Sequence, residues 1–193
     1  MSDYYFDIET YSKTKDPDFS NDEIIAITYQ QIDSRTGEVK GKLNILKSWE
    51  SSEEEILQRF YPIFNVENKW DFVPIGYNLS FDFTSLIYRW RKMDTKVNAK
   101  SLLSLFAQRA YIDIQPVVIM FNRGRFEGAK LEKFAGKRYP GSKVREWYEK
   151  KDYTAIQDYI EDEADRFLKL YQFSVQRLPD VWLEFAKESK IVI

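Results

Sequence analysis

The sequence predicts an α/β fold in which a mixed β-sheet is flanked by α-helices. Short runs rich in aromatic and β-branched residues, typical of strands, alternate with stretches whose apolar residues recur at helical spacing. The 193 residues are enough for one domain with a sizeable core, and 17% aromatic and 31% charged residues fit a well-packed globular protein. We therefore expect a single domain over residues 1–193.

The first three elements read as strands. YYFDI (residues 4–8) is short, aromatic and β-branched, and the turn-like stretch TYSKTKDPDFSND follows it. Residues 24–33 and 42–49 are also strand-like, and the turn SRTGEVKG separates them. These two strands are expected to form a hairpin that continues an antiparallel sheet from the first strand.

Helices and two further strands follow. SSEEEILQRFYPIF (51–64) begins with a Ser cap and early glutamates, which predicts a helix. DFVPIGYN (71–78) is a short strand that runs into a loop, and FDFTSLIYRWRKM (81–93) has helical spacing. AYIDIQPVVIM (110–120) is strand-like at its start, and NRGR (122–125) is a turn.

The C-terminal part is expected to be helical. The predicted helices are AKLEKFAGK (129–137), SKVREWYEKK (142–151), the stretch from Asp152 to about Tyr171, and VQRLPDVWLEFAKE (175–188). In the last of these, a Pro kinks or restarts the helix. The order β-β-β-α-β-α-β-α-α-α favours a mixed sheet with helices on its faces.

The composition excludes several kinds of site. The chain has no His and no Cys, which rules out Ser-His-Asp and Cys-His nucleophiles, His-ligated zinc and disulfides. Any metal must be held by oxygen, which points to Mg²⁺ or Mn²⁺. The net charge of −2 predicts no strong attraction of the whole molecule to nucleic acid, although a local basic patch remains compatible with it.

Neither a membrane span nor a secretory signal is expected. No run of about 18 apolar residues is present, and the N-terminus lacks a basic region followed by an apolar one. We therefore expect a cytoplasmic protein.

Acidic residues gather at three places, and the first is the strand that holds Asp7 and Glu9. Alternate strand positions point to the same side, so these two carboxylates share a face. Side by side on a core strand they repel each other and lose hydration, and a cation between them would remove both problems.

The second and third acidic places lie on predicted helices. Asp82 stands between Phe81 and Phe83 near a helix start, where an N-terminal capping role is the common alternative. In DYIEDEADRFLKLY (158–171), Tyr159 and Glu163 are one helical turn apart and face the same way, and a solvated acidic face is the alternative.

Taken together and in this order, these motifs resemble the DEDD superfamily of 3′–5′ exonucleases. The similar branch is the Tyr-containing one that includes the proofreading domains of family B DNA polymerases. FDIET resembles the first motif, GYNLSFDF the second and YIEDEADRFLKLY the third, while AYIDI and KLEKFAG resemble elements that precede the third motif. The resemblance extends from Tyr4 to about Tyr171 and implies an RNase H-like fold.

One position departs from the family pattern. The family has Asp four residues after the Tyr, where this sequence has Glu163. A gapless reading keeps the apolar helical stripe in place and favours Glu163, whereas a shift by one residue would use Asp162, about 100° away around the helix.

The resemblance implies a metal-dependent 3′–5′ exonuclease that hydrolyses phosphodiester bonds at the 3′ ends of single-stranded DNA or RNA, with DNA favoured. Two Mg²⁺ or Mn²⁺ ions would be held by Asp7, Glu9, Asp82 and Glu163. Tyr159 would orient the attacking water or help to deprotonate it. The implied substrate-binding residues are Asn78, Thr10 and Phe81.

Basic residues could bind the phosphates, although a solubilising surface explains each of them equally well. They are Arg89, Arg91, Lys92, Arg123, Arg125, Lys137 and Arg138. Two other functions stay open: a catalytically weak exonuclease-fold protein that binds nucleic acid or a protein partner, and an RNase H-like endonuclease.

Overall fold

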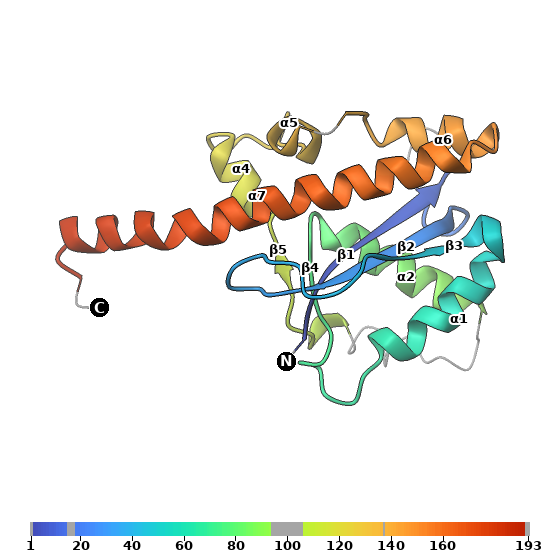
Figure 1. Cartoon of the computed structure of the whole chain (residues 1–193), viewed down its shortest axis with the longest axis horizontal. Helices are drawn as coiled ribbons and strands as arrows, with labels where there is room; N and C mark the ends of the chain where they lie inside the picture. The colour runs from blue at the N-terminus through green and yellow to red at the C-terminus, as the bar shows by residue number, and fades with distance from the viewer. Residues whose placement is uncertain (1, 15–17, 94–105, 137, 192–193) are drawn as a thin grey trace.

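The computed structural model describes residues 2–14, 18–93, 106–136 and 138–191 and contains one five-stranded sheet (Figure 1). The strand order is β3-β2-β1-β4-β5. The strands are β1 (Asp3–Tyr11), β2 (Glu23–Ile32), β3 (Asn44–Lys47), β4 (Val73–Gly76) and β5 (Ile112–Asp113). β1 pairs antiparallel with β2 and parallel with β4, so the predicted mixed sheet is confirmed.

Helices cover both faces of this sheet. α1 (Glu53–Phe64) and α2 (Leu79–Met93) lie on one face, and α7 (Tyr153–Glu188) crosses the other (Figure 1). A short 3₁₀ turn, η1 (Ser48–Glu50), precedes α1. The small helices α4 (Gln115–Phe121), α5 (Leu131–Ala135) and α6 (Ser142–Glu149) lie beside α7. The predicted α/β class is therefore confirmed.

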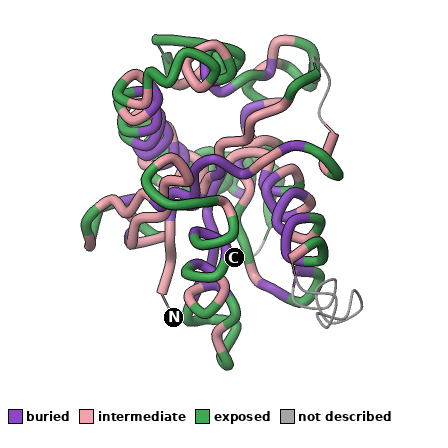
Figure 2. Tube along the Cα trace, turned by 90° about the vertical axis from the view of Figure 1, so that its right-hand side faces the viewer, coloured by how far each residue is buried: buried purple, intermediate pink, exposed green. Residues whose placement is uncertain are grey.

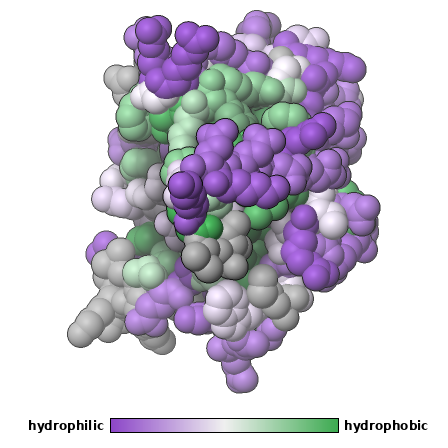
Figure 3. All heavy atoms as spheres, turned by 90° about the vertical axis from the view of Figure 1, so that its left-hand side faces the viewer, coloured by the Kyte–Doolittle hydropathy of each residue, from purple (hydrophilic) through white to green (hydrophobic). Residues whose placement is uncertain are grey.

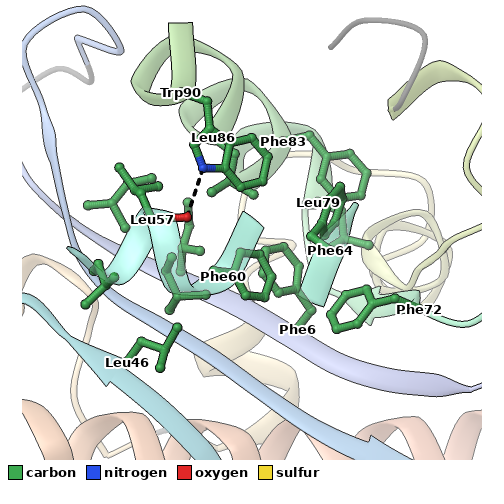
Figure 4. Packing of buried hydrophobic residues seen from close by; sticks show 14 of the residues in the cluster. Phe6, Leu46, Leu57, Phe60, Phe64, Phe72, Leu79, Phe83, Leu86 and Trp90 are labelled. Carbon is green, nitrogen blue, oxygen red and sulfur yellow. Dashed lines mark hydrogen bonds between the residues drawn. The ribbon is translucent and has the colours of Figure 1, made fainter. Parts of the chain in front are cut away.

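The alternation of side chains along β1 divides the core in two. Phe6 and Ile8 point toward α1 and α2, where they join a buried cluster with Phe60 and Phe64 (Figure 4). Tyr5 points the other way and packs on Phe167 of α7, with ring centroids 4.9 Å apart. In Figure 2, the buried positions of the helices lie on the sides that face the sheet.

Several elements differ from the prediction in their bounds. β1 continues to Tyr11 because Thr10 and Tyr11 pair with β2 beyond an irregularity between Glu9 and Thr10. The stretch over 110–120 is predicted to be strand-like at its start, and only Ile112 and Asp113 of it pair in the sheet. Pro116 then stands in the first turn of α4, where its fixed φ and missing N–H favour a helix start.

The C-terminal helices are one continuous helix. α7 has 36 residues, which corresponds to a length of about 54 Å, and contains Pro179 without a break. Pro179 lacks the N–H that would bond to the Val175 carbonyl four residues earlier. Positions 176, 177 and 179–185 are largely exposed, so water can reach this part of the helix. Within the described ranges, no helix combines the length and apolar character needed to cross a membrane.

The end of α7 projects beyond the sheet. It exposes Val181, Trp182, Leu183 and Phe185. Figure 3 shows the face of the molecule on the side where α7 ends. Hydrophobic and hydrophilic residues lie next to one another on this face.

The substitution Phe60→Ala tests the packing of the sheet on α1. Phe60 is fully buried and contacts the rings of Phe6 and Phe64, so its removal leaves a cavity. We expect the free energy of unfolding to fall by about 3–5 kcal/mol in urea denaturation. The matched control is Phe126→Ala at an exposed site, expected to stay within about 0.5 kcal/mol of the parent. Equal effects of the two substitutions would contradict the packing described.

Candidate active site

Two carboxylates of β1 lie on the face of the sheet that α7 covers. Asp7 and Glu9 are half-buried, whereas Ile8 between them is buried on the opposite face. β2 pairs with β1 along Asp7 and Glu9, whereas β4 pairs with β1 only at Asp3, Tyr4 and Tyr5. The position of both carboxylates is therefore set by regular strand pairing.

α7 brings a third carboxylate to the same place. Each of Asp7, Glu9 and Glu163 offers an oxygen, and these oxygens all lie within 4.8 Å of one another. We call these three residues the carboxylate cluster. Glu163 is only 6% exposed, because the apolar stripe of α7 presses this part of the helix onto the sheet.

Asp162 points away from the carboxylate cluster. Its carboxylate accepts a hydrogen bond from Nε of Arg166 at 2.7 Å and lies 3.7 Å from Nε of Arg138. The structure thus places Glu163, and not Asp162, beside Asp7 and Glu9.

Asp82 lies in the first turn of α2 and reaches the same strand. It is 3% exposed, and its Oδ1 accepts a hydrogen bond from the Ile8 N–H at 3.0 Å. The alternative N-cap role is wrong, because α2 begins at Leu79. Burial raises the pKa of Asp82 well above its usual range, the negative charges of Asp113 and Glu163 raise it further, and the Ile8 hydrogen bond opposes the shift.

The loop before α2 is held by a residue that sequence reasoning did not assign. The Asp113 carboxylate on β5 accepts hydrogen bonds from the backbone N–H groups of Asn78 and Leu79, both at 2.9 Å. Asn78 has a positive φ of 59°, a conformation that Asn adopts more readily than most residues. The Asn78 side chain accepts a bond from the Ser80 hydroxyl at 3.2 Å. Asp113 thereby fixes the start of α2 and with it Asp82.

Tyr159 is buried beside the carboxylate cluster. Burial raises the pKa of its hydroxyl far above the usual range, and the negative charges of Glu9 and Glu163 and a hydrogen bond with Glu163 add to the shift. Its hydroxyl is therefore protonated at neutral pH and acts as a donor, which favours an orienting role over that of a base.

Tyr5 is a second buried tyrosine near these acids, and sequence reasoning did not assign it. Burial raises the pKa of its hydroxyl, and the charges of Asp7, Glu163, Glu9 and Asp82 contribute in that order. The strand period could have identified it, because positions 5, 7 and 9 share a face.

The expected substrate-binding residues lie around the ends of these elements. Thr10 follows the irregularity in β1 and is half-buried. Phe81 is half-buried on α2, with its ring centroid 5.3 Å from that of Phe19. Phe83 is buried in the core with Phe64 and Phe106, so it is a packing residue.

The basic candidates for phosphate binding differ in their exposure and in their acidic partners. Arg89 is wrong as a candidate, because it is buried and its Nε donates to the Glu53 carboxylate at 2.6 Å. Arg138 lies beside Asp162. Arg138 is itself exposed, and the other exposed candidates are Arg91, Lys92, Arg123 and Arg125. Lys137 lies outside the described residues.

The carboxylate cluster fits a hard divalent cation. Around one octahedral Mg²⁺ with Mg–O distances of about 2.1 Å, adjacent ligand oxygens lie about 3 Å apart and opposite ones about 4.2 Å apart. The three oxygens lie within 4.8 Å of one another, so they would draw closer together around a bound ion. Carboxylate oxygens are also the ligands that hard cations prefer.

Comparisons with known proteins support the fold. No family model and no curated protein match the sequence. The structure is similar to the family B DNA polymerase from the hyperthermophilic archaeon Pyrobaculum calidifontis, with a TM-score of 0.59, 18% identity, and coverage of 92% of this chain and 24% of that chain. It is also similar to E. coli exonuclease I in complex with a dT13 oligonucleotide, with a TM-score of 0.62, 13% identity, and coverage of 94% and 42%.

A third similar structure is the zinc-bound form of an E. coli exonuclease I–single-stranded DNA complex, with a TM-score of 0.61, 14% identity, and coverage of 94% and 42%. This chain thus spans less than half the length of each of these proteins. The resemblance predicted from the motifs is confirmed at the level of the fold.

The pH dependence of stability tests the burial of Asp82. A carboxyl group whose folded pKa is raised contributes stability that is complete below its unfolded pKa of about 3.9 and is lost as the pH rises through the folded pKa. In EDTA, we therefore expect Asp82→Asn to gain Tm relative to the parent as the pH rises from about 4 toward neutral.

Thermal unfolding by circular dichroism measures this difference. Asn keeps an acceptor for the Ile8 N–H, and Asp180→Asn on the exposed end of α7 is the control. A Tm difference between Asp82→Asn and the parent that stays constant with pH would show that Asp82 is not buried as described.

Proposed function

We propose that this chain is a metal-dependent 3′–5′ exonuclease that hydrolyses phosphodiester bonds at the 3′ end of single-stranded DNA. The observation that carries the proposal is the convergence of Asp7, Glu9 and Glu163 on one point, with Asp82 and Tyr159 beside them. The fold supports it, because a similar fold occurs in E. coli exonuclease I, solved with a dT13 oligonucleotide.

The proposed cofactor is a pair of Mg²⁺ or Mn²⁺ ions. Asp7, Glu9, Glu163 and Asp82 would hold them, and the bound ions would supply activation of a water molecule and offset of charge on the scissile phosphate. The absence of His and Cys from the chain leaves oxygen ligands for this role.

The protein side chains would prepare the site in three ways. The carboxylate cluster repels a phosphate by its own charge, so substrate approach depends on a bound cation. Tyr159 is protonated and hydrogen-bonded to Glu163, and its hydroxyl would turn its one proton from that carboxylate to the attacking water and so orient it. Asn78, Thr10 and Phe81 would contact the terminal nucleotide.

Glu163 takes the fourth acidic position in this proposal. The additional methylene of Glu compared with Asp is accommodated, because the Glu163 carboxylate already lies with those of Asp7 and Glu9. The competing function is a catalytically weak protein of this fold that binds nucleic acid or a protein partner.

Digestion of a 5′-labelled single-stranded DNA, with its RNA counterpart in parallel, tests the proposed activity. With Mg²⁺ or Mn²⁺ we expect a ladder that shortens from the 3′ end, and none with EDTA. Asp7→Asn should reduce the rate by more than about 100-fold. Loss of a group that only hydrogen-bonds to a metal ligand costs about 10–100-fold in metal affinity or activity, and Asp7 is itself a proposed ligand. Absence of hydrolysis by the folded parent protein would favour the binding function, and internal cleavage would favour an endonuclease.

A matched pair of substitutions tests the assignment on α7. Glu163→Gln should reduce the rate by more than about 100-fold, because it removes a charge from the carboxylate cluster. Asp162→Asn, one residue away and paired with Arg166, should change it by less than about threefold. Initial rates on the same labelled DNA measure both, and the reverse order of effects would move the fourth acid to Asp162.

A further inference from the structure

We infer that Phe19 and Tyr88, which form an aromatic row with Phe81, bind the nucleotides that lie upstream of the 3′ end, while Phe81 stays at the terminal nucleotide. This inference rests on the proposed function and extends it, because it assigns a path for the single strand beyond the terminal nucleotide. Single-stranded nucleic acid is bound typically by aromatic side chains on which bases stack, next to basic residues that attract the backbone.

The three rings are in contact across two separate parts of the chain. Phe19 comes from the loop between β1 and β2, and its ring centroid is 5.3 Å from Phe81 and 6.0 Å from Tyr88. The planes of Phe19 and Tyr88 differ by only 26°, so the two rings stack on each other and a base would extend this stack. Tyr88 is 44% exposed, and the other two are half-buried.

The loop that carries Phe19 is held in a defined turn. The backbone N–H of Asp22 donates to the Asp18 carbonyl at 2.7 Å, and the buried Asp22 carboxylate accepts from the Asp18 N–H at 2.8 Å. The Asp18 carboxylate accepts bonds from Ser20 and Asn21. Phe19 is therefore presented from a preorganised turn, which reduces the entropy that ligand binding would cost.

The aromatic row begins next to Asp82 at the start of α2. Phe81 directly precedes Asp82, whose carboxylate binds the Ile8 N–H between Asp7 and Glu9. Phe81 and Tyr88 are seven residues apart on α2, which places them on one side of the helix about 10 Å apart along its axis. At the spacing of about 3.4 Å found in a stacked strand, this length corresponds to about three bases.

The charge along this side of α2 suits a phosphodiester backbone. Between Leu79 and Met93 the helix has one acidic residue, the buried Asp82. Arg91 and Lys92 are exposed in the last turn, beyond Tyr88. The aromatic row thus lies along α2 between Asp82 and two exposed cations, as expected for a strand that leads away from the active site.

A base-specific fluorescence experiment tests this path. Oligonucleotides with 2-aminopurine at the first or at the fourth position from the 3′ end would be bound to the Asp7→Asn protein in Mg²⁺, because stacking on a ring quenches this base. We expect Phe19→Ala/Tyr88→Ala to abolish the additional quenching at the fourth position and to leave the first position unchanged. It should also weaken binding of a 12-nucleotide DNA by about 10–100-fold, in line with the loss of stacking partners.

Two further variants control this result. Trp182→Ala/Phe185→Ala removes a comparable exposed aromatic pair from the end of α7 and should leave DNA binding unchanged. Phe19→Tyr/Tyr88→Phe keeps both rings and should retain quenching and affinity. If Phe19→Ala/Tyr88→Ala binds and quenches like its parent while the wild-type protein digests DNA, the path is wrong and the proposed function stands. Failure of the wild-type protein to bind or digest DNA would overturn both.

Discussion

The mutual repulsion of three carboxylates is the constraint around which this structure is organised. Oxygens of Asp7, Glu9 and Glu163 lie within 4.8 Å of one another, although like charges this close oppose folding in the absence of a cation. Packing elsewhere holds them together. Tyr5 anchors β1 against Phe167 of α7, while Phe6 and Ile8 anchor its other face on α1 and α2. The apolar core thus maintains an arrangement that electrostatics alone would disperse, and a site of this kind gains from binding a dication.

The second constraint is the junction of β4, β5 and α2. An added Cβ at Gly76 would lie 2.6 Å from the Phe6 carbonyl oxygen, so β4 can approach β1 closely only with glycine there. Asp113 then binds the first N–H groups of the turn into α2, and Asp82 binds the N–H of Ile8. This chain of contacts runs from β5 through α2 to the strand that holds Asp7 and Glu9. The placement of Asp82 therefore depends on Asp113 through geometry.

The sequence predicts those features that arise from local periodicity. The shared face of Asp7 and Glu9 follows from the strand period, and the start of α1 follows from Ser52, whose side chain accepts from the Glu55 N–H. Features that depend on distant pairing were not predictable. The role of Asp113 requires β5 to lie beside β4, and the burial of Arg89 requires Glu53, which is 36 residues away. The fold and the three acidic motifs were thus accessible from sequence, whereas their supporting residues were not.

The central claim is that the carboxylate cluster binds divalent metal, and anomalous diffraction from crystals grown with Mn²⁺ tests it most directly. We expect an anomalous peak among the carboxylates of Asp7, Glu9 and Glu163, with a second peak on the side of Asp82. We also expect Glu163→Gln to weaken or remove these peaks under the same conditions. Mn²⁺ bound only elsewhere, or no Mn²⁺ peak in well-ordered crystals at millimolar metal, would show that the carboxylate cluster is not a metal site.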